Sequence, residues 1–193
     1  MRKLVVIEFL SLDGVMQGPG SPDEDREGGF EHGGWPQPYV DEVQGAAATE
    51  GMAGTDAYLF GRKTYDKMTG YWPSASSDDP MAAQLNSTRK YVVSRTLQSP
   101  SWQNTTVIDS DVAAAVSELK RQSGGNIAVL GSGELVQTLI ANDLVDEFRL
   151  FVHPVVLGRG KRLFRSSDRP RALRLIDSRT TTTGVLLLTY APA

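Results

Sequence analysis

Short apolar runs alternate with amphipathic stretches over the first 141 residues of the chain. Runs rich in Val, Ile, Leu, Phe and Tyr have the length of buried strands, and they lie at 3–10, 56–60, 90–94, 105–108 and 126–130. Helical spacing or helix-capping residues mark the segments between them, at 39–49, 61–69, 80–85, 112–121 and 133–141. This alternation of strand and helix predicts an α/β fold with a mostly parallel central sheet.

The pattern changes after Asp143. The segments 147–156, 172–179 and 185–190 are β-like and are separated by turns rather than helices, so they predict antiparallel strands that complete the sheet as a C-terminal hairpin. The chain shows no internal repeat, no linker and no low-complexity tract. A single domain spanning residues 1–193 is therefore expected.

A long polar segment interrupts this pattern near the start of the chain. Residues 14–38, GVMQGPGSPDEDREGGFEHGGWPQP, are rich in Gly, Pro and acidic side chains. Loops of this length inside a compact domain are usually functional lids or disordered segments. Phe30 and Trp35 favour at least partial order, because fully solvated tails rarely carry aromatic residues. We interpret residues 14–38 as an active-site lid.

Composition narrows the classes of function. The formal net charge of −3 indicates no general affinity for nucleic acid or anionic membranes. The chain has no cysteine, which excludes disulfides, thiolate metal sites and a cysteine nucleophile. The two histidines, His32 and His153, lie far apart in sequence, so no metal site is expected. No apolar run is long enough to span a membrane, and the N-terminus lacks a signal-peptide pattern. These features are typical of a bacterial cytoplasmic protein.

Two glycine-containing junctions follow apolar strands and open helices. They are YLFGRKT at 58–64 and AVLGSGEL at 128–135. The first N–H groups of a helix have no intrahelical partner, and glycine lets an anion approach the backbone closely. Two such sites in one sheet suit a dinucleotide pyrophosphate. Each junction alone is equally compatible with a tight turn, and Val136 stands where the Rossmann pattern requires a third Gly or Ala.

A third junction indicates which dinucleotide would bind, one with or one without a 2′-phosphate. The strand that begins at Tyr91 runs directly into Ser94, Arg95 and Thr96. Hydroxyl groups beside a guanidinium form a good environment for a ribose 2′-phosphate, because the fork of Arg matches phosphate oxygens. A solvated turn is the alternative interpretation.

The order of these motifs resembles the dihydrofolate reductase superfamily, and more closely the reductase domain of the riboflavin biosynthesis deaminase-reductase. The resemblance rests on SLDG at 11–14, GRKTY at 61–65, YVVSRTL at 91–97, the long run from Val129 to Phe164, and GGFEHGGWPQPYVDE within 28–42. Together these segments span nearly the whole chain. The deaminase half needs two zinc-binding thiolates, so a chain without cysteine is not the bifunctional enzyme.

The resemblance implies a dihydrofolate reductase-like three-layer fold that binds NADPH. Carried over position by position, the cofactor-binding residues are Gly61, Arg62, Lys63 and Thr64 on one side of the pyrophosphate, Ser94, Arg95 and Thr96 around the 2′-phosphate, and Gly131, Ser132, Gly133, Glu134 and Leu135 on the opposite helix. The family often has Gly-Gly where this chain has Gly131 and Ser132. The acid that folate enzymes carry in the first helix has no well-spaced counterpart here, so true dihydrofolate reductase activity is not expected.

The implied chemistry is hydride transfer from NADPH to a C=N or C=O group of a small pteridine-like or pyrimidine-like heterocycle. Asp13 is the catalytic candidate, as an orienting or proton-relaying group, although Asp-Gly is also a common turn. His32, Trp35 and Tyr39 are candidate substrate contacts, and the aromatic rings equally suit packing against a second subunit. His153, which precedes Pro154, is interpreted as structural.

Two other functions stay open at this point. One is a non-catalytic nucleotide-binding protein of the same fold. The other is a Rossmann-type dehydrogenase that prefers NAD, which predicts an acidic residue at a strand end after the glycine loop. The riboflavin-type relatives further imply a homodimer, for which the apolar segment 148–156 offers a possible sheet edge.

Overall fold

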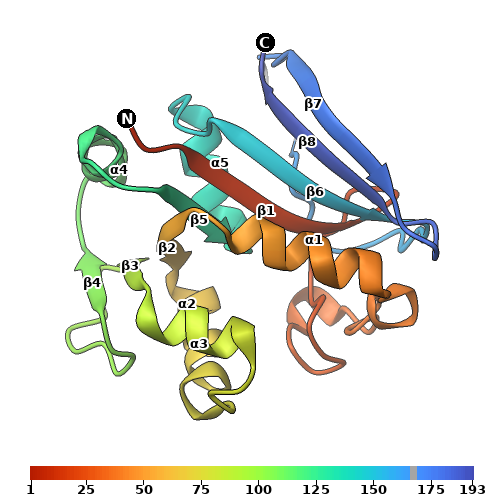
Figure 1. The fold of residues 1–193 in the computed structure, drawn as a ribbon, viewed down its shortest axis with the longest axis horizontal. Helices are drawn as coiled ribbons and strands as arrows, with labels where there is room; N and C mark the ends of the chain where they lie inside the picture. Colours follow the sequence, from red (N-terminus) through yellow and green to blue (C-terminus); the bar gives the residue numbers. More distant parts are fainter. Residues whose placement is uncertain (166–168) are drawn as a thin grey trace. The chain divides into compact units, whose positions relative to one another are not determined.

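Strands and helices alternate along most of the chain, as the apolar pattern predicts (Figure 1). The computed structural model describes residues 1–165 and 169–193. The strands are β1 (Leu4–Ser11), β2 (Thr55–Gly61), β3 (Arg89–Val93), β4 (Thr105–Ile108), β5 (Asn126–Leu130), β6 (Glu147–His153), β7 (Leu173–Thr180) and β8 (Leu186–Pro192). The helices are α1 (Glu42–Met52), α2 (Arg62–Thr69), α3 (Pro80–Ser87), α4 (Val112–Arg121) and α5 (Gly133–Ala141), with short 3-10 helices η1 (Glu27–Gly29), η2 (Gln37–Tyr39) and η3 (Trp72–Ser74).

The strands of the described residues form an eight-stranded sheet in the order β4-β3-β2-β5-β1-β6-β8-β7. β2 pairs in parallel with β3 and β5, and β3 pairs in parallel with β4. β8 runs antiparallel to both β6 and β7. The mostly parallel sheet with an antiparallel C-terminal hairpin is thereby confirmed. Parallel neighbours need crossover connections, which the helices between them supply.

The chain divides into two compact units, and each unit is built from two segments. Unit 1 comprises Met1–Val6 and Gly51–Val145, and unit 2 comprises Ile7–Glu50 and Asp146–Ala193. The chain therefore passes between the units three times, after residues 6, 50 and 145.

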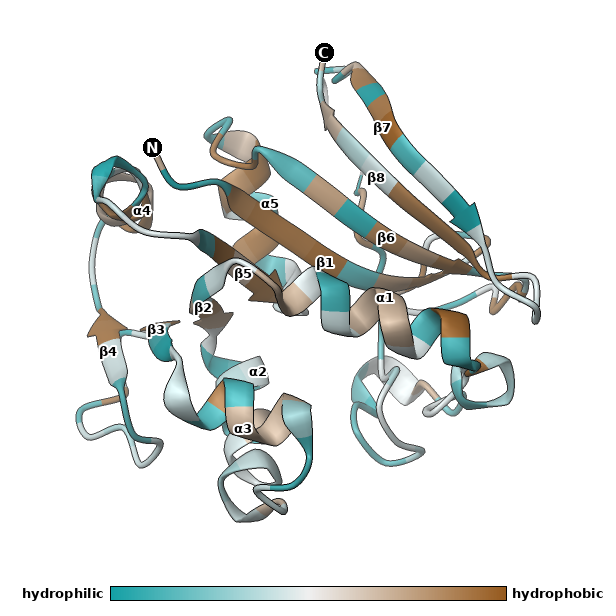
Figure 2. Cartoon of the chain, in the orientation of Figure 1, coloured by the Kyte–Doolittle hydropathy of each residue, from teal (hydrophilic) through white to brown (hydrophobic). Residues whose placement is uncertain are grey.

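The core of unit 1 is built on two strands that are buried on both faces. Residues 57–60 of β2 and 127–129 of β5 are almost fully buried, and Figure 2 shows both strands as strongly hydrophobic. Continuous apolar runs of this kind are expected where helices cover both sides of a parallel sheet. Asp79 and Asp111 cap α3 and α4, because Asp79 accepts the N–H of Met81 at 2.8 Å and Asp111 accepts the N–H of Ala114 at 3.0 Å.

A buried lysine joins α3 to β3 in the same unit. The Nζ atom of Lys90 donates to the carbonyl oxygens of Leu85 and Thr88, each at 2.7 Å, and lies 4.6 Å from the ring centroid of Trp102. These carbonyls belong to the C-terminal end of α3, where helix carbonyls lack partners. Burial lowers the pKa of Lys90 to about 8. Lys90 thereby ties α3 to the strand that ends beside Ser94.

Unit 2 packs α1 and the long loop onto β1, β6 and β8. One cluster joins Ala47 of α1 to Phe151, Val185 and Leu187. Asp41 caps α1 by accepting the N–H of Gln44 at 2.8 Å, and its second oxygen accepts the N–H of Thr182 at 2.7 Å in the turn between β7 and β8. One carboxylate therefore fixes both the start of the helix and the hairpin turn.

Glu8 has neither of the two environments that its place in a strand suggests. A charge in an apolar run needs a partner or an exposed face. Glu8 is only 3% exposed, and among the described residues its Oε1 atom has no hydrogen-bond partner. Burial raises the pKa of this carboxyl well above its ordinary value. Neutralisation by protonation is what makes this burial tolerable.

Two of the differences between the predicted and the observed element boundaries have a clear physical reason. The first helix begins at Glu42 rather than residue 39, because Pro38 and Tyr39 form η2 and Asp41 acts as the cap. The strand predicted over 147–156 ends at His153, because Pro154 has no N–H to donate. The prediction that this segment forms a sheet edge is wrong: β6 lies between β1 and β8, and an inner position explains its apolar character. The outer strands are β4 and β7.

Candidate functional site

The two glycine junctions meet at the carboxyl ends of neighbouring parallel strands in unit 1. β2 ends at Gly61 and leads directly into α2, and β5 leads through Gly131 and Ser132 into α5. Because β2 and β5 are parallel neighbours, both junctions lie at the same edge of the sheet. The backbone N–H of Gly61 donates to the hydroxyl oxygen of Ser132 at 2.9 Å. The sequence indicated each junction separately, and the structure brings them into contact.

Left-handed backbone conformations shape the second junction. Gly131 has φ +62° and Ser132 has φ +68°, and no peptide bond among the described residues is cis. A Cβ atom at position 131 would lie 3.6 Å from the side chain of Thr64. Glycine is favoured at position 131 by this backbone conformation, whereas the 3.6 Å distance is an ordinary van der Waals contact. Ser132 is the costlier residue, because its Cβ disfavours a positive φ.

The first turn of α2 reaches toward the third junction. Arg62 donates from Nε to both carboxylate oxygens of Asp66 at 2.8 Å, and its Nη1 lies 3.4 Å from the hydroxyl oxygen of Thr96. Lys63 is exposed beside it. Arg62 thus lies between α2 and the turn after β3, so the residues predicted to hold a pyrophosphate and a 2′-phosphate belong to one continuous surface of unit 1.

The turn after β3 is held by its own serine. The hydroxyl oxygen of Ser94 accepts the N–H groups of Thr96 at 3.2 Å and Leu97 at 3.0 Å. Ser94 is buried while Arg95 is exposed. This arrangement fixes the backbone of the turn and leaves the guanidinium of Arg95 facing solvent.

A cavity of about 330 Å³ opens at this turn. Its walls come from the ends of β3 and β4, the start of α4 and one residue of α5. The lining residues are Val93, Ser94, Arg95, Ile108, Asp109, Ser110, Asp111, Val112, Ala113 and Thr138. The sequence indicated only the Ser94–Arg95 wall. The β4–α4 wall was missed because its place depends on the parallel pairing of β3 with β4, and only the helix-capping role of the segment 109–111 was readable.

Asp13 lies in unit 2, where its carboxylate holds the segment after β6. It accepts the Ser11 hydroxyl at 2.7 Å and the N–H groups of Leu157 at 3.1 Å and Gly158 at 2.9 Å, and it pairs with Arg162. Burial opposes ionisation, but these hydrogen bonds outweigh it and lower the pKa of Asp13 to about 2. The carboxylate is therefore ionised at neutral pH.

Aromatic residues from β1, the long loop and η2 surround His153. Trp35 is 8% exposed, its Nε1–H donates to the carbonyl of Gln17 at 2.8 Å, and its ring meets His153 edge-on at 5.1 Å. Tyr39 and Phe9 lie 5.9 and 5.6 Å from the same imidazole. His32 is exposed and instead contacts Phe30 at 5.7 Å. Trp35 and Tyr39 are thus brought together, and His32 lies apart from them.

His153 is fully buried, and its partners fix its tautomer. Nδ1 lies 2.9 Å from the carbonyl oxygen of Phe151 and 3.3 Å from that of Leu10, so Nδ1 carries the proton. Among the described residues Nε2 has no partner. Burial lowers the pKa of His153, although the two carbonyl contacts act in the opposite direction. A neutral imidazole inside an aromatic cluster is consistent with the structural role that the sequence suggested.

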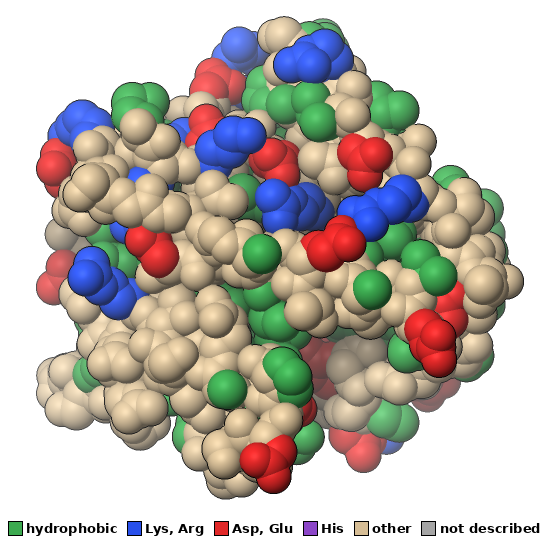
Figure 3. Space-filling view, viewed as in Figure 1, with side chains coloured by type: hydrophobic (Ala, Val, Ile, Leu, Met, Phe, Trp, Pro, Cys, Tyr) green, Lys and Arg blue, Asp and Glu red, His purple; other side chains and the backbone are tan. Residues whose placement is uncertain are grey.

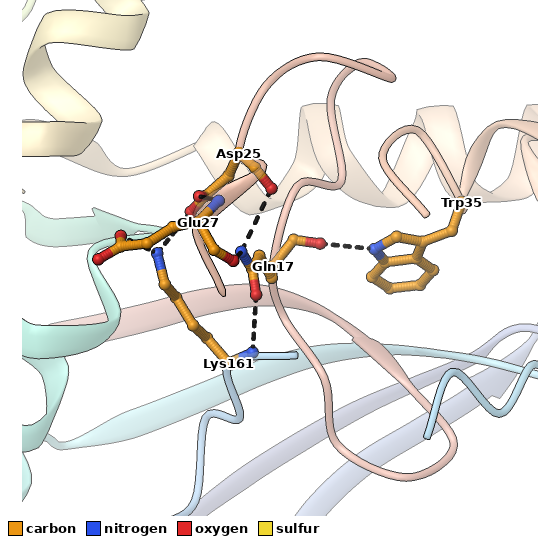
Figure 4. A network of polar contacts seen from close by, with 5 residues as sticks. All are labelled: Gln17, Asp25, Glu27, Trp35 and Lys161. Atoms are coloured by element: carbon orange, nitrogen blue, oxygen red, sulfur yellow. Dashed lines mark hydrogen bonds and ion pairs between the residues drawn. The ribbon is translucent and has the colours of Figure 1, made fainter. Parts of the chain in front are cut away.

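Hydrogen bonds and ion pairs hold the loop 14–38 at several points. Figure 4 shows Gln17 donating to the carbonyls of Asp25 and Glu27 while its Oε1 accepts the N–H of Lys161 at 3.0 Å. The Lys161 ammonium pairs with the carboxylates of Asp25 at 2.8 Å and Glu27 at 2.6 Å. Val15, Phe30 and Trp35 form a buried cluster beneath this network. The partial order predicted from the aromatic residues is confirmed.

No helix among the described residues has both the length and the apolar character needed to cross a membrane. No group of three or more His, Cys, Asp or Glu side chains in residues 1–165 and 169–193 is arranged to hold a metal ion.

Comparison with known proteins places this arrangement in a family. The model of the RibD C-terminal domain matches residues 2–187. The chain belongs to the RibD C-terminal domain family. Two Bacillus subtilis (strain 168) proteins are relatives: the uncharacterized protein YyaP is 36% identical over 140 residues, covering 70% of this chain and 73% of YyaP, and the uncharacterized protein YwjB is 30% identical over 177 residues, covering 90% and 89%.

Solved structures share the fold of this RibD C-terminal domain protein at low sequence identity. A protein described as a riboflavin biosynthesis protein, from Shewanella sp. PV-4, has a TM-score of 0.70 and 20% identity over 99% of both chains. A pyrimidine reductase-like protein from Corynebacterium diphtheriae has a TM-score of 0.63 and 13% identity over 100% of this chain and 92% of its own. The Thermotoga maritima diaminohydroxyphosphoribosylaminopyrimidine deaminase/5-amino-6-(5-phosphoribosylamino)uracil reductase has a TM-score of 0.64 and 13% identity, and the match covers 57% of that longer chain.

Proposed function

We propose that this RibD C-terminal domain protein is an NADPH-dependent reductase of a small nitrogen heterocycle of the pyrimidine or pteridine class. The observation that carries the proposal is the convergence of three sequence motifs, at 61–64, 94–96 and 131–135, at one edge of the unit 1 strands. The names of the structural neighbours, which include a pyrimidine reductase-like protein and a uracil reductase, support the reaction class.

The residues of unit 1 fit a dinucleotide phosphate. Gly61 and Gly131 carry no Cβ, which suits close approach of a phosphate to the backbone at both junctions. Arg62 and Lys63 supply positive charge in the first turn of α2, and Arg95 supplies it at the mouth of the cavity. A reduced nicotinamide, when bound, supplies the hydride. The chain orients the cofactor through Thr64, Ser132 and the backbone around them.

Asp13 enters this proposal as a fixed negative charge. With a pKa of about 2, its carboxylate does not donate a proton at neutral pH. It instead holds the turn at Leu157 and Gly158, and that role is compatible with orienting a substrate. Trp35, Tyr39 and His32 keep their proposed place as substrate-side residues of the loop, with Trp35 and Tyr39 contributing through the packing around His153.

One observation favours NADH as a second candidate cofactor. Asp109 follows β4 and lines the same cavity as Arg95. A carboxylate suits the free hydroxyls of an unphosphorylated ribose, whereas a guanidinium suits a 2′-phosphate. The Rossmann-type dehydrogenase is not supported, because the strand order and the antiparallel hairpin differ from the Rossmann arrangement.

A fluorescence titration with NADPH and NADH tests the proposal. We expect wild-type protein to bind NADPH more tightly than NADH. Arg95→Ala should weaken NADPH binding by about tenfold to a hundredfold and leave NADH binding nearly unchanged, because a guanidinium–phosphate contact is worth roughly 1.5–3 kcal/mol. Asp109→Asn is the matched variant in the same cavity, and it should strengthen the binding of NADPH relative to the binding of NADH.

The outcomes separate the candidates. If NADH binds more tightly and Asp109→Asn weakens it, the NADH alternative replaces the NADPH proposal. If the wild type binds neither dinucleotide, the reductase proposal fails. If NADPH binds but no pyrimidine or pteridine substrate oxidises it, the protein binds the nucleotide without the proposed chemistry.

A further inference from the structure

His153 lies where two hydrophobic clusters of unit 2 meet. Trp35 belongs to the cluster beneath the loop 14–38, Tyr39 packs against the cluster that joins α1 to the sheet, and Phe9 packs against both. The imidazole of His153 contacts all three rings, with centroid distances of 5.1 Å to Trp35, 5.9 Å to Tyr39 and 5.6 Å to Phe9. One fully buried side chain therefore connects the aromatic part of the loop to the sheet.

The two nitrogens of this imidazole have unequal surroundings. Nδ1–H donates to the carbonyl oxygen of Phe151 at 2.9 Å, and the carbonyl oxygen of Leu10 lies 3.3 Å from the same nitrogen. Nε2 carries the lone pair of the neutral imidazole, and among the described residues it has no hydrogen-bond partner. A proton added to Nε2 would create a buried cation with an N–H group that has no acceptor, which is costly.

The charged side chains of β1 and β6 do not offer this cation a partner. Glu8 precedes Phe9 in β1, and successive side chains of a strand point to opposite faces of the sheet. Because Phe9 contacts His153, Glu8 faces away from it. Glu147 and Arg149 lie at least four residues from His153 along β6 and pair with each other at 2.7 Å.

The charged and titratable groups near the loop share one property: each is exposed or is bound to another group of unit 2. They are Asp13, Asp23, Glu24, Asp25, Arg26, Glu27, Glu31, His32 and Asp41. Tyr39 is the one titratable residue among the rings that His153 contacts. The described residues of these elements therefore provide no counter-ion for an imidazolium at this position.

This environment makes acid unfavourable to the closed cluster. Burial lowers the pKa of His153 from its ordinary value of 6.5, although the two carbonyl contacts oppose the shift. In an opened loop the imidazole is hydrated and regains the ordinary value. Below pH 6.5 the open state therefore binds more protons than the closed state, and acid favours opening.

We propose that His153 is a pH-sensitive positioning residue, which holds Trp35 and Tyr39 in place while it is neutral and releases them when Nε2 is protonated. The Lys161 network holds the other half of the loop (Figure 4), so the release concerns residues 30–39. The inference rests on packing within unit 2 and does not depend on the reductase proposal. In a reductase, the same step would withdraw the substrate-side residues of the loop in acid.

Hydrogen exchange between pH 5 and pH 8 tests this release. Two reporters are the amide of Tyr39, which donates to the carbonyl of Pro36 at 2.9 Å, and the indole N–H of Trp35, which donates to the carbonyl of Gln17 at 2.8 Å. After correction for intrinsic exchange rates, their protection should fall by about tenfold per pH unit below the ordinary pKa, because opening takes up one proton. The amide of Met16, in the other half of the loop, should show no such fall.

Two variants assign the titrating group. His153→Asn keeps an N–H donor in the place of Nδ1–H and cannot titrate, so the pH dependence should disappear. His32→Asn removes the other histidine of the chain and should keep the dependence of the wild type. The same fall in His153→Asn as in wild type, or constant protection of both reporters in wild type, would overturn the proposal.

A titration of the wild-type imidazoles by NMR keeps the test decisive if His153→Asn does not fold. The chain has two histidines, and His32→Asn identifies their signals. Glu8 does not imitate the effect, because its raised pKa stabilises the folded state in acid. We expect His153 to titrate below pH 6.5, together with the loss of protection at Tyr39. Titration of His153 at or above pH 6.5 would show that the surrounding rings stabilise the cation, and would overturn the proposal.

Discussion

Asp13 has a structural role that its SLDG turn alone does not indicate. Asp in an SLDG turn is compatible with proton relay, but here each carboxylate oxygen accepts a backbone N–H of the Leu157–Gly158 turn. These contacts join segments that are 144 and 145 residues apart in sequence. The carboxylate is therefore a cross-link of unit 2 as well as a candidate substrate-side charge.

Asp13→Asn should destabilise the protein by roughly 1–2 kcal/mol, because the amide replaces one accepting oxygen with a donor that faces a backbone N–H. The pKa of Asp13 is lowered to about 2, so its contribution is complete above the ordinary pKa near 3.8 and is lost as the pH falls toward 2. Urea unfolding at pH 7 and at pH 3 measures this. Asp23→Asn, at an exposed ion pair, is the control. Equal stability of Asp13→Asn and wild type at pH 7 would contradict the cross-link.

Glu8 provides the opposite dependence on pH. Its pKa is raised in the folded protein, so the folded state binds more protons than the unfolded state above pH 4.5. Stability contributed by the neutral carboxyl is therefore present at low pH and is lost as the pH rises through the folded pKa.

Glu8→Gln keeps the shape of this side chain and removes its titration. We expect the thermal midpoint of the variant to exceed that of wild type by more at pH 8 than at pH 5. Glu118→Gln, at an exposed ion pair, should show no such trend. A constant difference between Glu8→Gln and wild type across this pH range would show that Glu8 is not the titrating group.

At the scale of elements, the loop 14–38 is an anchored structure rather than a free flap. Lys161 holds it through two carboxylates and one backbone N–H, and Trp35 is buried within it (Figure 4). The composition of the loop indicated its length and partial order. The anchor was not readable, because nothing near residues 14–38 in sequence marks Lys161 as their partner.

Lys161→Met should loosen this loop without unfolding the protein. The variant keeps the apolar stem and the backbone N–H that Gln17 accepts, and it loses both carboxylate contacts. We expect a stability loss of roughly 0.5–1.5 kcal/mol and faster amide exchange in residues 23–29. Arg26→Met removes an exposed ion pair of the same loop and should have little effect on either measurement. Unchanged exchange in Lys161→Met would show that the apolar cluster alone holds the loop.

The strands and helices were largely predictable because their signals are local. Gly61 after a buried strand, Asp79 before Pro80 and the apolar spacing of 112–121 each determine structure within a few residues. The left-handed Ser132 and the cavity wall at Asp109 were not predictable, because both depend on which strands become neighbours. The chemistry of the candidate site was therefore visible in sequence as separate parts, and its assembly was not.

At the scale of the whole molecule, the distribution of surface charge and the exposed edge strand of the sheet determine which partners the surface can bind. On the face drawn in Figure 3, cationic and acidic side chains are interspersed, in line with the net charge of −3. The edge strand β7 is exposed along most of its length, and Leu175 and Ile176 are each 49% exposed. Figure 2 shows β7 alternating between hydrophilic and hydrophobic residues. An exposed edge of this kind is a place where a second chain can pair.

We propose that the expected homodimer pairs through this edge. We expect light scattering to give about twice the chain mass of 21.0 kDa, and Ile176→Lys to shift the protein toward the monomer, because a charge on an edge strand opposes pairing. Leu12→Lys changes another exposed apolar residue, away from β7, and should leave the mass unchanged. A monomeric wild type would remove the dimer from the description of this protein.

The division of the chain into interleaved segments has a consequence for its synthesis. Unit 1 is complete once residue 145 has left the ribosome, whereas unit 2 begins at Ile7 and needs the chain beyond residue 146. The side chain of Gln17, for example, accepts the backbone N–H of Lys161, which is made 144 residues later. The first segment of unit 2, residues 7–50, is thus made early. It lacks the second segment of its unit, which begins at Asp146, while unit 1 forms. Phe9 packs against Phe151 and His153, so we expect it to stay exposed until those residues are made, and chaperones that recognise apolar segments would act in that interval.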